Sequence, residues 1–430
     1  MRQLKFSSKI ATLLTLIGVA VGLGNVWRFP YMMGQYGGSA FLFIYILFTI
    51  LFGIPALIAE FALGRNTSST VVGAYTTAFN SNFGKIYAWF IASTIFIANA
   101  YYIVVISNIA YSGFYSIVYG FKFGTNPIGE GLHNNKLQLL ISILTLSFGI
   151  WIISRGLKKG IERFSKIIVP FFGIIMIYLI YHVLTLPNAT HYLAEFLIPN
   201  FDKLTPKNIF AALGQAFFTL SLGGTTLIAY SNYIDRSTSL GKLAVSTALG
   251  DLSAALLASL FIIPAVLVYK LNMNEGFTLL FTTLPNVFSM MPMGRILGSL
   301  FILALLFIAL LSSIAVLQLF SQMFLNTTKL NFKQSIVITG MLEFLLIIPC
   351  ALQPNIIGTL DLIFGSGMQI FGSCIAMIAL TFGLGKRKTI MEIFNNKKGV
   401  YPKIFFIWIK WIIPITLLLV LGIYLYNILN

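Results

Sequence analysis

Five charged residues lie within stretches of sequence that are otherwise strongly apolar: Arg28, Glu60, Asp251, Glu343 and Asp361. A carboxylate or guanidinium in such a stretch is unfavourable unless it has a partner or lines a wet cavity, so each is a candidate for binding an ion or a polar ligand. Glu343 also fits a structural position near a helix end. The other four are the stronger candidates for ligand chemistry.

Two glycine-rich segments, 18–30 and 215–226, interrupt apolar stretches. In a helix Gly costs about 1 kcal/mol and Pro about 3 kcal/mol relative to Ala, so both segments predict an unwound turn. Unwound backbone within a membrane is tolerated where it is buried in protein or faces water, and its carbonyls and amides can then bind ions and carboxylates. For either segment alone, close helix packing through glycine is the alternative.

Long apolar stretches must position these residues. A helix needs roughly 20 apolar residues to cross the hydrocarbon core, and we expect an all-α membrane protein with eleven transmembrane helices. They are expected near residues 10–33, 39–64, 86–119, 137–154, 164–186, 207–233, 242–270, 295–325, 334–352, 356–383 and 403–428.

The two interrupted spans are the first and the sixth, which is the spacing that two inverted repeats of five helices produce, with a ligand at their interface. The sequence therefore predicts one transporter domain over residues 1–430. We expect repeat one at about 10–186, repeat two at about 207–383 and an extra span at 403–428.

Composition excludes several classes of protein. Only 9% of residues are charged and 58% are hydrophobic, whereas about 25% are charged in soluble domains. The net charge of +17 does not indicate nucleic acid, because the basic residues lie in short gaps between apolar runs, where they fit loops beside anionic membrane lipid. With a cytoplasmic N-terminus most Lys and Arg fall inside, and an odd number of spans places the C-terminus outside.

The residue types do not indicate disulfides, a Cys/His metal site or an enzyme active site. The two cysteines lie in apolar stretches and the histidines are scattered, so neither a disulfide framework nor a Cys/His metal site is expected. No pair of nucleophile and base and no cofactor motif is evident, so we expect no enzyme. No feature of the sequence sets the oligomeric state.

Several longer strings resemble the neurotransmitter:sodium symporter family in its bacterial amino-acid branch. These are AVGLGNVWRFPYMMGQYGGSAFLFIY from Ala20, GIPALIAEFALGR from Gly53, GIERFSKIIVP from Gly160 and GQAFFTLSLGGTT from Gly214. The likeness covers nearly the whole chain, in an eleven-span form of the leucine-transporter-type fold. It implies a carrier in the bacterial inner membrane that couples sodium to amino-acid uptake by alternating access.

The resemblance implies two sodium ions. The first would lie against the carboxylate of the substrate, held by the carbonyls of Ala20 and Thr219, the side chains of Asn25 and Thr219, and Asp251. In the family that this chain resembles, most members carry Asn at the position of Asp251. Hard oxygen ligands suit sodium in either case, and a carboxylate adds a full negative charge.

That charge bears on chloride. Chloride-dependent members carry a Ser one helical turn after Asp251, and this chain has Ala255, although Tyr45, Gln215 and Thr219 match the rest of the anion site. We expect Asp251 to supply the negative charge itself, so that chloride is not required.

The second sodium site in the family uses carbonyls of the first span and hydroxyls of the eighth. The corresponding residues are expected to be Gly18, Val21, Ala309, Ser312 and Ser313. A register shifted by one residue is the alternative, and it puts Leu311 at a ligand position.

For the substrate, the resemblance implies a pocket with mostly apolar walls, which favours a hydrophobic side chain. Since Gly224 and Ala98 are small, the pocket should admit a large aliphatic or aromatic L-amino acid. The substrate-binding residues are expected to be Val21, Leu23, Gly24, Ala98, Tyr102, Phe217, Phe218, Thr219, Ser221, Gly224, Ser312 and Val316.

Gates are expected on both sides of this pocket. Outside, Arg28 and Asp361 match a gating pair of the family, with Tyr102 and Phe218 as the lid beneath. An Arg–carboxylate contact of this kind can close across a water-filled vestibule.

Inside, the family pairs an N-terminal Arg with an Asp at the end of the eighth span. This chain has Arg2 and Lys5 near the first position but Asn326 and Thr327 near the second. Tyr233 and the basic N-terminal segment are expected to close the path differently.

Two alternatives to the sodium symporter remain at this point. One is a proton-coupled amino-acid carrier on the same fold, because Asp251 could carry a proton. The other is a sensor that binds an amino acid without transporting it.

Overall fold

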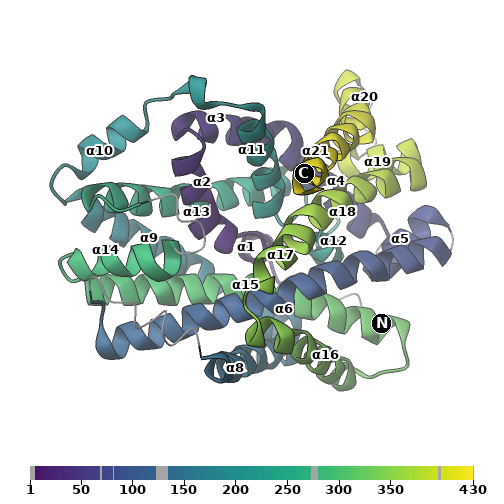
Figure 1. The fold of residues 1–430 in the computed structure, drawn as a ribbon. Helices are drawn as coiled ribbons and strands as arrows, with labels where there is room; N and C mark the ends of the chain where they lie inside the picture. Colours follow the sequence, from purple (N-terminus) through teal and green to yellow (C-terminus); the bar gives the residue numbers. More distant parts are fainter. Residues whose placement is uncertain are drawn as a thin grey trace.

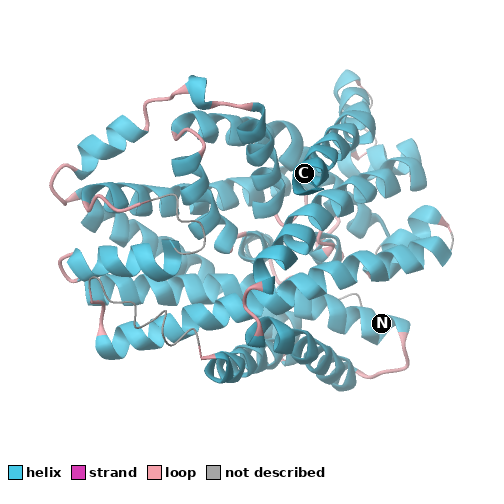
Figure 2. Cartoon of the chain, viewed as in Figure 1, coloured by secondary structure: helices cyan, strands magenta, loops and turns pink. Residues whose placement is uncertain are grey.

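The computed structural model describes residues 5–67, 70–80, 82–122, 134–272, 279–395 and 399–429. Every regular element in these ranges is helical, as Figure 2 shows. The all-α prediction is confirmed. Short π-helical segments (η) continue several of the α-helices.

The elements of the first part of the chain begin with a helix that is interrupted after Ala20. They are α1 Lys9–Ala20, η1 Gly24–Arg28, α2 Phe29–Gln35, α3 Ser39–Phe48, η2 Thr49–Gly53, α4 Ile54–Thr67, α5 Val71–Phe79, α6 Asn82–Tyr119, α8 Asn135–Ser154, η3 Leu157–Glu162, α9 Arg163–Leu184, α10 Ala189–Phe196 and the short 3-10 helix η4 Phe201–Lys203.

The second part also begins with an interrupted helix. Its elements are α11 Pro206–Thr219, α12 Thr226–Ser231, α13 Leu240–Val268, η5 Leu279–Thr283, α14 Leu284–Met290, α15 Gly294–Thr327, α16 Phe332–Leu352, α17 Ile356–Leu360, η6 Asp361–Gly367, α18 Met368–Ile378, η7 Ala379–Gly383, α19 Gly385–Phe394, α20 Val400–Ile407, η8 Trp408–Ile412 and α21 Ile413–Leu429.

Side-chain caps start the first half of each interrupted helix. Ser8 accepts a hydrogen bond from the Ala11 amide at the start of α1, and Thr205 accepts one from the Asn208 amide at the start of α11. Such caps satisfy amides that have no partner within the helix. Pro206 at the first position of α11 is favourable because its fixed φ suits a helix start.

Nine helices of the described ranges are long and apolar enough to cross a membrane, and a tenth span results if the bent pair Lys9–Ala20 and Gly24–Gln35 counts as one. These agree with ten of the predicted spans. The remaining prediction, 207–233, is divided between α11 and α12, and neither reaches the roughly 20 residues that a crossing needs. The count of eleven and the two inverted repeats stay predictions.

Helix α1 lies at the centre of the molecule, where it packs against α9, α13 and α15 (Figure 1). The two longest helices, α6 and α15, run side by side through the body of the fold. Helix α16 packs on both of them, and α18 packs on α4 and α21. The interruption after α1 is therefore enclosed by helices from both parts of the chain.

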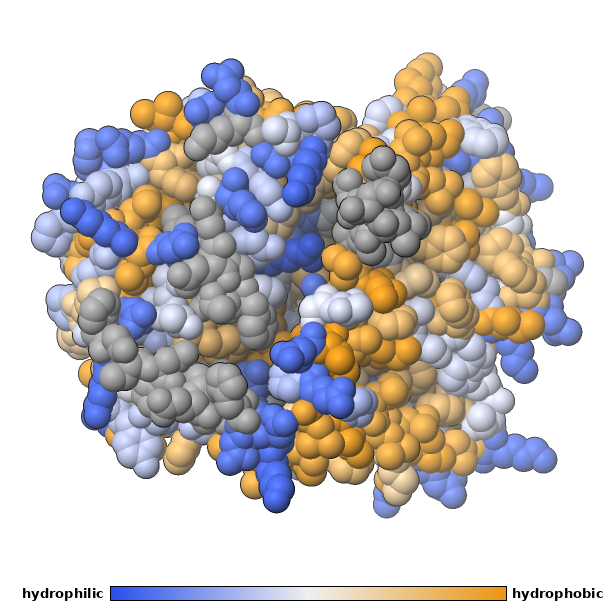
Figure 3. Space-filling view, in the orientation of Figure 1, coloured by the Kyte–Doolittle hydropathy of each residue, from blue (hydrophilic) through white to orange (hydrophobic). Residues whose placement is uncertain are grey.

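The outer surface carries many hydrophobic side chains. In Figure 3 these gather over the region of α16 and over α20–α21, while hydrophilic side chains lie around the centre of the view and at its edges. Met341 and Leu345 on α16 and Ile404 and Leu419 on α20 and α21 are all more than half exposed. Such a belt fits contact with lipid tails rather than with water.

Candidate functional site

The first helix is broken between Ala20 and Gly24, where its axis bends by 59°. The Gly22 amide donates to Asn25 Oδ1 at 3.0 Å, so the Asn25 side chain reaches back across the break. The Val19 and Val21 carbonyls meet side chains from other helices instead of the next helical turn. Backbone oxygens are thereby directed into the centre of the protein, as the glycine-rich sequence predicted.

The second break separates α11 from α12, and three of its residues have positive φ: Ser221 at 53°, Gly223 at 80° and Thr225 at 62°. The Gly223 amide donates to Glu60 Oε1 at 2.7 Å. A Cβ on Gly223 would lie 1.7 Å from the Gln369 carbonyl oxygen, so only glycine fits there. Glu60, predicted as a functional candidate, supports this unwound segment from the neighbouring helix α4.

Polar side chains from four elements meet beside the first break. Asn25 Nδ2 donates to Asp251 Oδ1 at 2.6 Å and to the Asp251 carbonyl at 3.1 Å. The Tyr45 hydroxyl lies 3.2 Å from Thr219 Oγ1 and donates to Asp251 Oδ2 at 3.4 Å. All four side chains are buried. We call Asn25, Tyr45, Thr219 and Asp251 the Asp251 cluster.

The Asp251 cluster has the chemistry of a cation site. Its carboxylate is fully buried in α13, and the side chains it meets, Asn25 and Tyr45, are neutral. A buried carboxylate is stabilised by a cation, and carboxylate, amide and hydroxyl oxygens are the ligands that hard cations prefer. The structure brings the side chains of Asn25, Thr219 and Asp251 together, and α1 ends at Ala20 beside them. These are the residues predicted for the first sodium.

A cavity of about 100 Å³ lies between the two breaks. Ten of the twelve residues predicted to bind substrate line it: Leu23, Gly24, Ala98, Tyr102, Phe218, Thr219, Ser221, Gly224, Ser312 and Val316. The Leu23 amide donates to the Tyr102 hydroxyl at 3.3 Å, so both groups sit at the cavity end expected to hold a carboxylate.

Two predicted substrate residues are not among those lining this cavity. Phe217 lines an outer cavity of about 320 Å³ instead. Phe217 immediately precedes Phe218 on α11, so the two side chains point about 100° apart. The Val21 side chain is buried elsewhere, while its carbonyl accepts from Ser312 Oγ at 3.2 Å.

Phe218 separates the inner and outer cavities, since it lines both. Its ring lies over Gly24, and the Arg28 guanidinium stands over the ring at 4.5 Å from the centroid. Asp361, which borders the inner cavity, accepts from the Tyr101 hydroxyl at 2.9 Å. Phe218 thus stands between the two cavities, while its role as a lid and the pairing of Arg28 with Asp361 stay predictions.

The residues predicted for the second sodium are only partly assembled. Ser312 Oγ lies 3.2 Å from both the Val19 and Val21 carbonyl oxygens. At Gly18, however, the nearest side chain of α15 is Leu311, whose methyl group would lie 2.8 Å from a Cβ on that glycine. The observed register is therefore the one that turns Leu311, rather than Ser313, towards α1.

Sequence reasoning missed one polar residue of the inner cavity, Asn99, and misplaced its partner Glu343. Asn99 borders the cavity and donates from Nδ2 to Glu343 Oε1 at 2.7 Å. The structural alternative for Glu343, a position near a helix end, is wrong: Glu343 lies in the middle of α16 and is fully buried. Asn99 follows Ile95 and Ala98 at helical spacing, and this pattern on one face of α6 was the signal that could have found it.

The N-terminal segment packs against acidic residues on two elements. Lys5 Nζ donates to Asp235 Oδ2 at 2.8 Å, and the Ser7 amide donates to Glu162 Oε2 at 3.0 Å. The Phe6 ring meets the Tyr233 ring edge-on at 5.9 Å. The hydrogen bond from Lys5 holds the pKa of Asp235 below its usual range.

These contacts match the expectation for the inner gate in part. Arg2 lies outside the described residues. Asn326 donates to the Gln322 carbonyl of its own helix at 2.7 Å. Tyr233 and the basic segment do meet, and Lys5 with Asp235 supplies an ion pair where the family pattern is missing.

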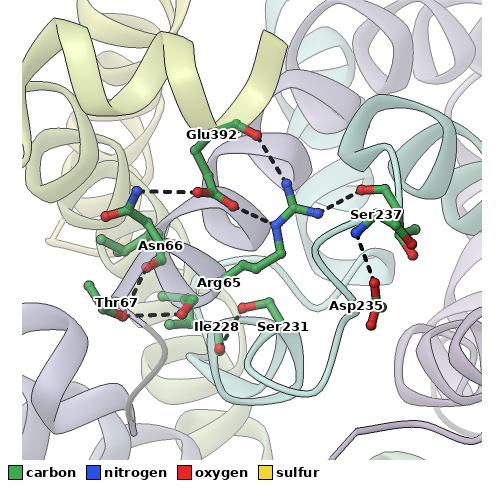
Figure 4. A network of polar contacts seen from close by, with 11 residues as sticks. Arg65, Asn66, Thr67, Ile228, Ser231, Asp235, Ser237 and Glu392 are labelled. Atoms are coloured by element: carbon green, nitrogen blue, oxygen red, sulfur yellow. Dashed lines mark hydrogen bonds and ion pairs between the residues drawn. The ribbon is translucent and has the colours of Figure 1, made fainter. Parts of the chain in front are cut away.

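A second ion pair lies beside the loop between α12 and α13, which also carries Asp235 (Figure 4). Arg65, at the end of α4, pairs with Glu392 of α19, and both side chains are buried. Arg65 Nη1 also donates to the Thr238 carbonyl at 2.6 Å. The loop between α12 and α13 is therefore held by Arg65 at one point and by Lys5 at another.

Two interrupted helices around a shared cavity, inside a bundle of membrane-length helices, define a membrane transporter of the leucine-transporter type. The chain belongs to the sodium:neurotransmitter symporter family, whose model matches residues 3–126 and 124–430. It is a sodium-dependent symporter and not an enzyme, as the resemblance implied.

Individual relatives agree with this assignment. The sodium-dependent transporter YhdH of Bacillus subtilis is 30% identical over 97% of each chain. The sodium-dependent neutral amino acid transporter B(0)AT3 of Mus musculus is 28% identical over 63% of this chain and 49% of its own. The crystal structure of MhsT in complex with L-phenylalanine superimposes with a TM-score of 0.88 at 32% identity, covering 97% of this chain and 98% of that one.

Proposed function

We propose that the chain imports a neutral L-amino acid with a large aliphatic or aromatic side chain, driven by sodium and without a requirement for chloride. The observation that carries this proposal is the convergence of ten predicted pocket residues on one cavity that adjoins the Asp251 cluster. MhsT, a similar structure, was crystallised with L-phenylalanine.

The carboxylate and the side chain of such a substrate would each meet suitable groups in the cavity between the two breaks. Its carboxylate would meet the Leu23 and Gly24 amides and the Tyr102 hydroxyl, because amides at the start of a half-helix favour anionic groups. Its side chain would lie against Ala98, Gly224 and Val316, whose walls are apolar. A hydrophobic side chain therefore gains most from this cavity.

In this proposal Asp251 balances the charge of sodium without a chloride ion. Its carboxylate lies within hydrogen-bonding distance of Tyr45, which also reaches Thr219. These residues, with Gln215, resemble the anion site of chloride-dependent members. Since Asp251 already places a full negative charge there, an additional anion would be repelled.

For the transport cycle we propose an N-terminus inside the bacterial inner membrane and a C-terminus outside. Phe218 and the pair Arg28 and Asp361 would close the outer path. Lys5, Phe6 and Tyr233 would close the inner path, where the contacts with Asp235 hold the N-terminal segment against the helix bundle. Alternating release of these two closures would carry the substrate across.

The test is uptake of a panel of labelled L-amino acids into proteoliposomes under an imposed sodium gradient. A parallel series uses a proton gradient without sodium, and another replaces chloride by gluconate. We expect accumulation of aromatic or large aliphatic amino acids with sodium in either anion. Uptake driven by protons alone would contradict the sodium coupling, and binding without uptake would identify a sensor.

A further inference from the structure

Helix α15 faces the first break with two residues of opposite chemistry. Leu311 and Ser312 are neighbours, about 100° apart on the helix, and both reach the broken helix. Leu311 is buried, with an exposed fraction of 2%. Its methyl group and the side chain of Val169 on α9 would lie 2.8 and 3.3 Å from a Cβ on Gly18. Two aliphatic side chains therefore enclose Gly18.

The hydroxyl of Ser312 is already engaged by backbone. Its Oγ lies 3.2 Å from the carbonyl oxygens of Val19 and Val21, and it has a single proton to donate. The Ser221 hydroxyl donates to the same Val19 carbonyl at 3.2 Å. The Val19 and Val21 carbonyls thus each accept a hydrogen bond from a hydroxyl group.

Ser313 cannot complete a cation site with Ser312. It lies about 200° around the helix from Leu311, on nearly the opposite side, while Leu311 is turned to Gly18. Ala309 is likewise about 200° from Leu311. The residue one turn before this face is Ile308, which is aliphatic and fully buried. Only one hydroxyl of α15 therefore faces the region beside Gly18.

A sodium ion needs several oxygen ligands, because it is a hard cation that loses its hydration shell on entering the protein. The Asp251 cluster supplies a carboxylate, an amide and two hydroxyl groups. The region beside Gly18 supplies aliphatic carbon from Leu311 in the place of a ligand, and this side chain also excludes the water that could substitute for one. The donor set beside Gly18 does not fit sodium.

We propose that this chain binds and transports one sodium ion per amino acid, at the Asp251 cluster, and that Leu311 fills the space beside Gly18 that a second ion would need. The inference rests on the proposed sodium-coupled uptake. It goes further in fixing the coupling ratio and in naming the residue that sets it.

The ratio determines how steeply the substrate accumulates. At zero membrane potential and equilibrium, one coupled ion lets a tenfold sodium gradient sustain about tenfold accumulation, whereas two ions sustain about hundredfold accumulation. In a logarithmic plot of substrate ratio against sodium ratio, the expected slope is about one. The same stoichiometry predicts a Hill coefficient of about one for sodium-stimulated binding of substrate.

The experiment measures that slope for wild-type protein in proteoliposomes held at zero potential with potassium and valinomycin. Labelled L-phenylalanine, or the best amino acid of the panel, is the substrate. Binding of radioactive sodium to purified protein in detergent gives the ion count independently of transport. A slope near two, or two sodium ions bound, would overturn the proposal, whereas uptake indifferent to sodium would overturn the proposed function itself.

Two variants of nearly equal shape test the role of Leu311. Leu311→Thr introduces a hydroxyl and Leu311→Val does not, so a difference between them reports the oxygen rather than the lost bulk. We expect Leu311→Thr to raise the slope and the sodium count towards two and Leu311→Val to leave both near one. Folding of each is checked by thermal unfolding. If Leu311→Thr folds and stays at one, Leu311 is not what excludes the second ion.

Discussion

The break in the first helix presents two regions to its neighbours, and they differ in almost every respect. Towards α11 and α13 it meets the Asp251 cluster, with its buried carboxylate and neutral oxygen donors. Towards α9 and α15 it meets Val169 and Leu311. Both regions lie beside the same break, so an interrupted helix alone does not make a cation site. The side chains that neighbouring helices bring to the break decide whether an ion can bind.

The largest effect is expected from Asp251→Asn, which removes the charge of the cluster while keeping its shape. Sodium affinity should fall by about tenfold to hundredfold, which corresponds to a loss of about 1.4–2.8 kcal/mol of the attraction between the two charges. Sodium titration of substrate binding measures this loss. Unchanged sodium affinity would show that the ion binds elsewhere.

A second substitution sharpens that test. Adding Ala255→Ser to Asp251→Asn restores the hydroxyl that chloride-dependent relatives carry one turn along α13. Uptake by the double variant is expected to recover in chloride and to stay low in gluconate. Equal recovery in both anions would contradict the view that Asp251 replaces chloride.

Gly18→Ala should affect stability rather than sodium binding. Its methyl group would press on Leu311 and Val169, and such overpacking costs about 1–3 kcal/mol. A lower thermal unfolding temperature, relieved by Leu311→Ala in the same chain, is expected. Gly173→Ala is the control, because a Cβ there meets nothing within 4 Å. A change in the Hill coefficient for sodium in Gly18→Ala would instead place an ion beside this glycine.

Much of this contrast could be predicted from the sequence. Hydropathy located the long helices, and the glycine-rich segments located both breaks. Asn25, Tyr45 and Thr219 of the Asp251 cluster lie within two short, specific strings, and Asp251 is evident as a charged residue in an apolar stretch. The sequence could not decide which residues of α15 face the first break. A shift of one residue rotates a helix face by about 100°, and Leu311-Ser312-Ser313 offers a hydroxyl in either register. Glu343 was misplaced because its partner Asn99 is 244 residues away.

Substitutions at the buried pair of Asn99 and Glu343 are expected to have a smaller effect on transport. Glu343→Gln keeps an acceptor for Asn99 Nδ2 and should change little, whereas Glu343→Leu leaves the amide without a partner at a cost of about 1–3 kcal/mol. Because Asn99 borders the cavity, Glu343→Leu should raise KM for the substrate more than it lowers kcat. Equal behaviour of the two variants would show that the hydrogen bond does not position Asn99.

The smallest effect is expected at Lys5 and Asp235, whose side chains are 45% and 50% exposed and therefore screened by solvent and salt. Since the folded pKa of Asp235 is lowered, the contribution of this pair is complete above the unfolded value of about 3.9 and is lost as the pH falls towards the folded value. Lys5→Gln should therefore lower the thermal unfolding temperature slightly, and by the same amount at every pH between about 6 and 8. A shift that varies across this range would assign the contact to a different titrating group.

The most direct test is equilibrium binding of labelled L-phenylalanine to the purified wild-type protein, titrated with sodium in a chloride-free buffer. The account predicts that sodium strengthens binding with a Hill coefficient of about one and that adding chloride changes nothing. Binding that ignores sodium, requires chloride or rises with a coefficient near two would contradict it.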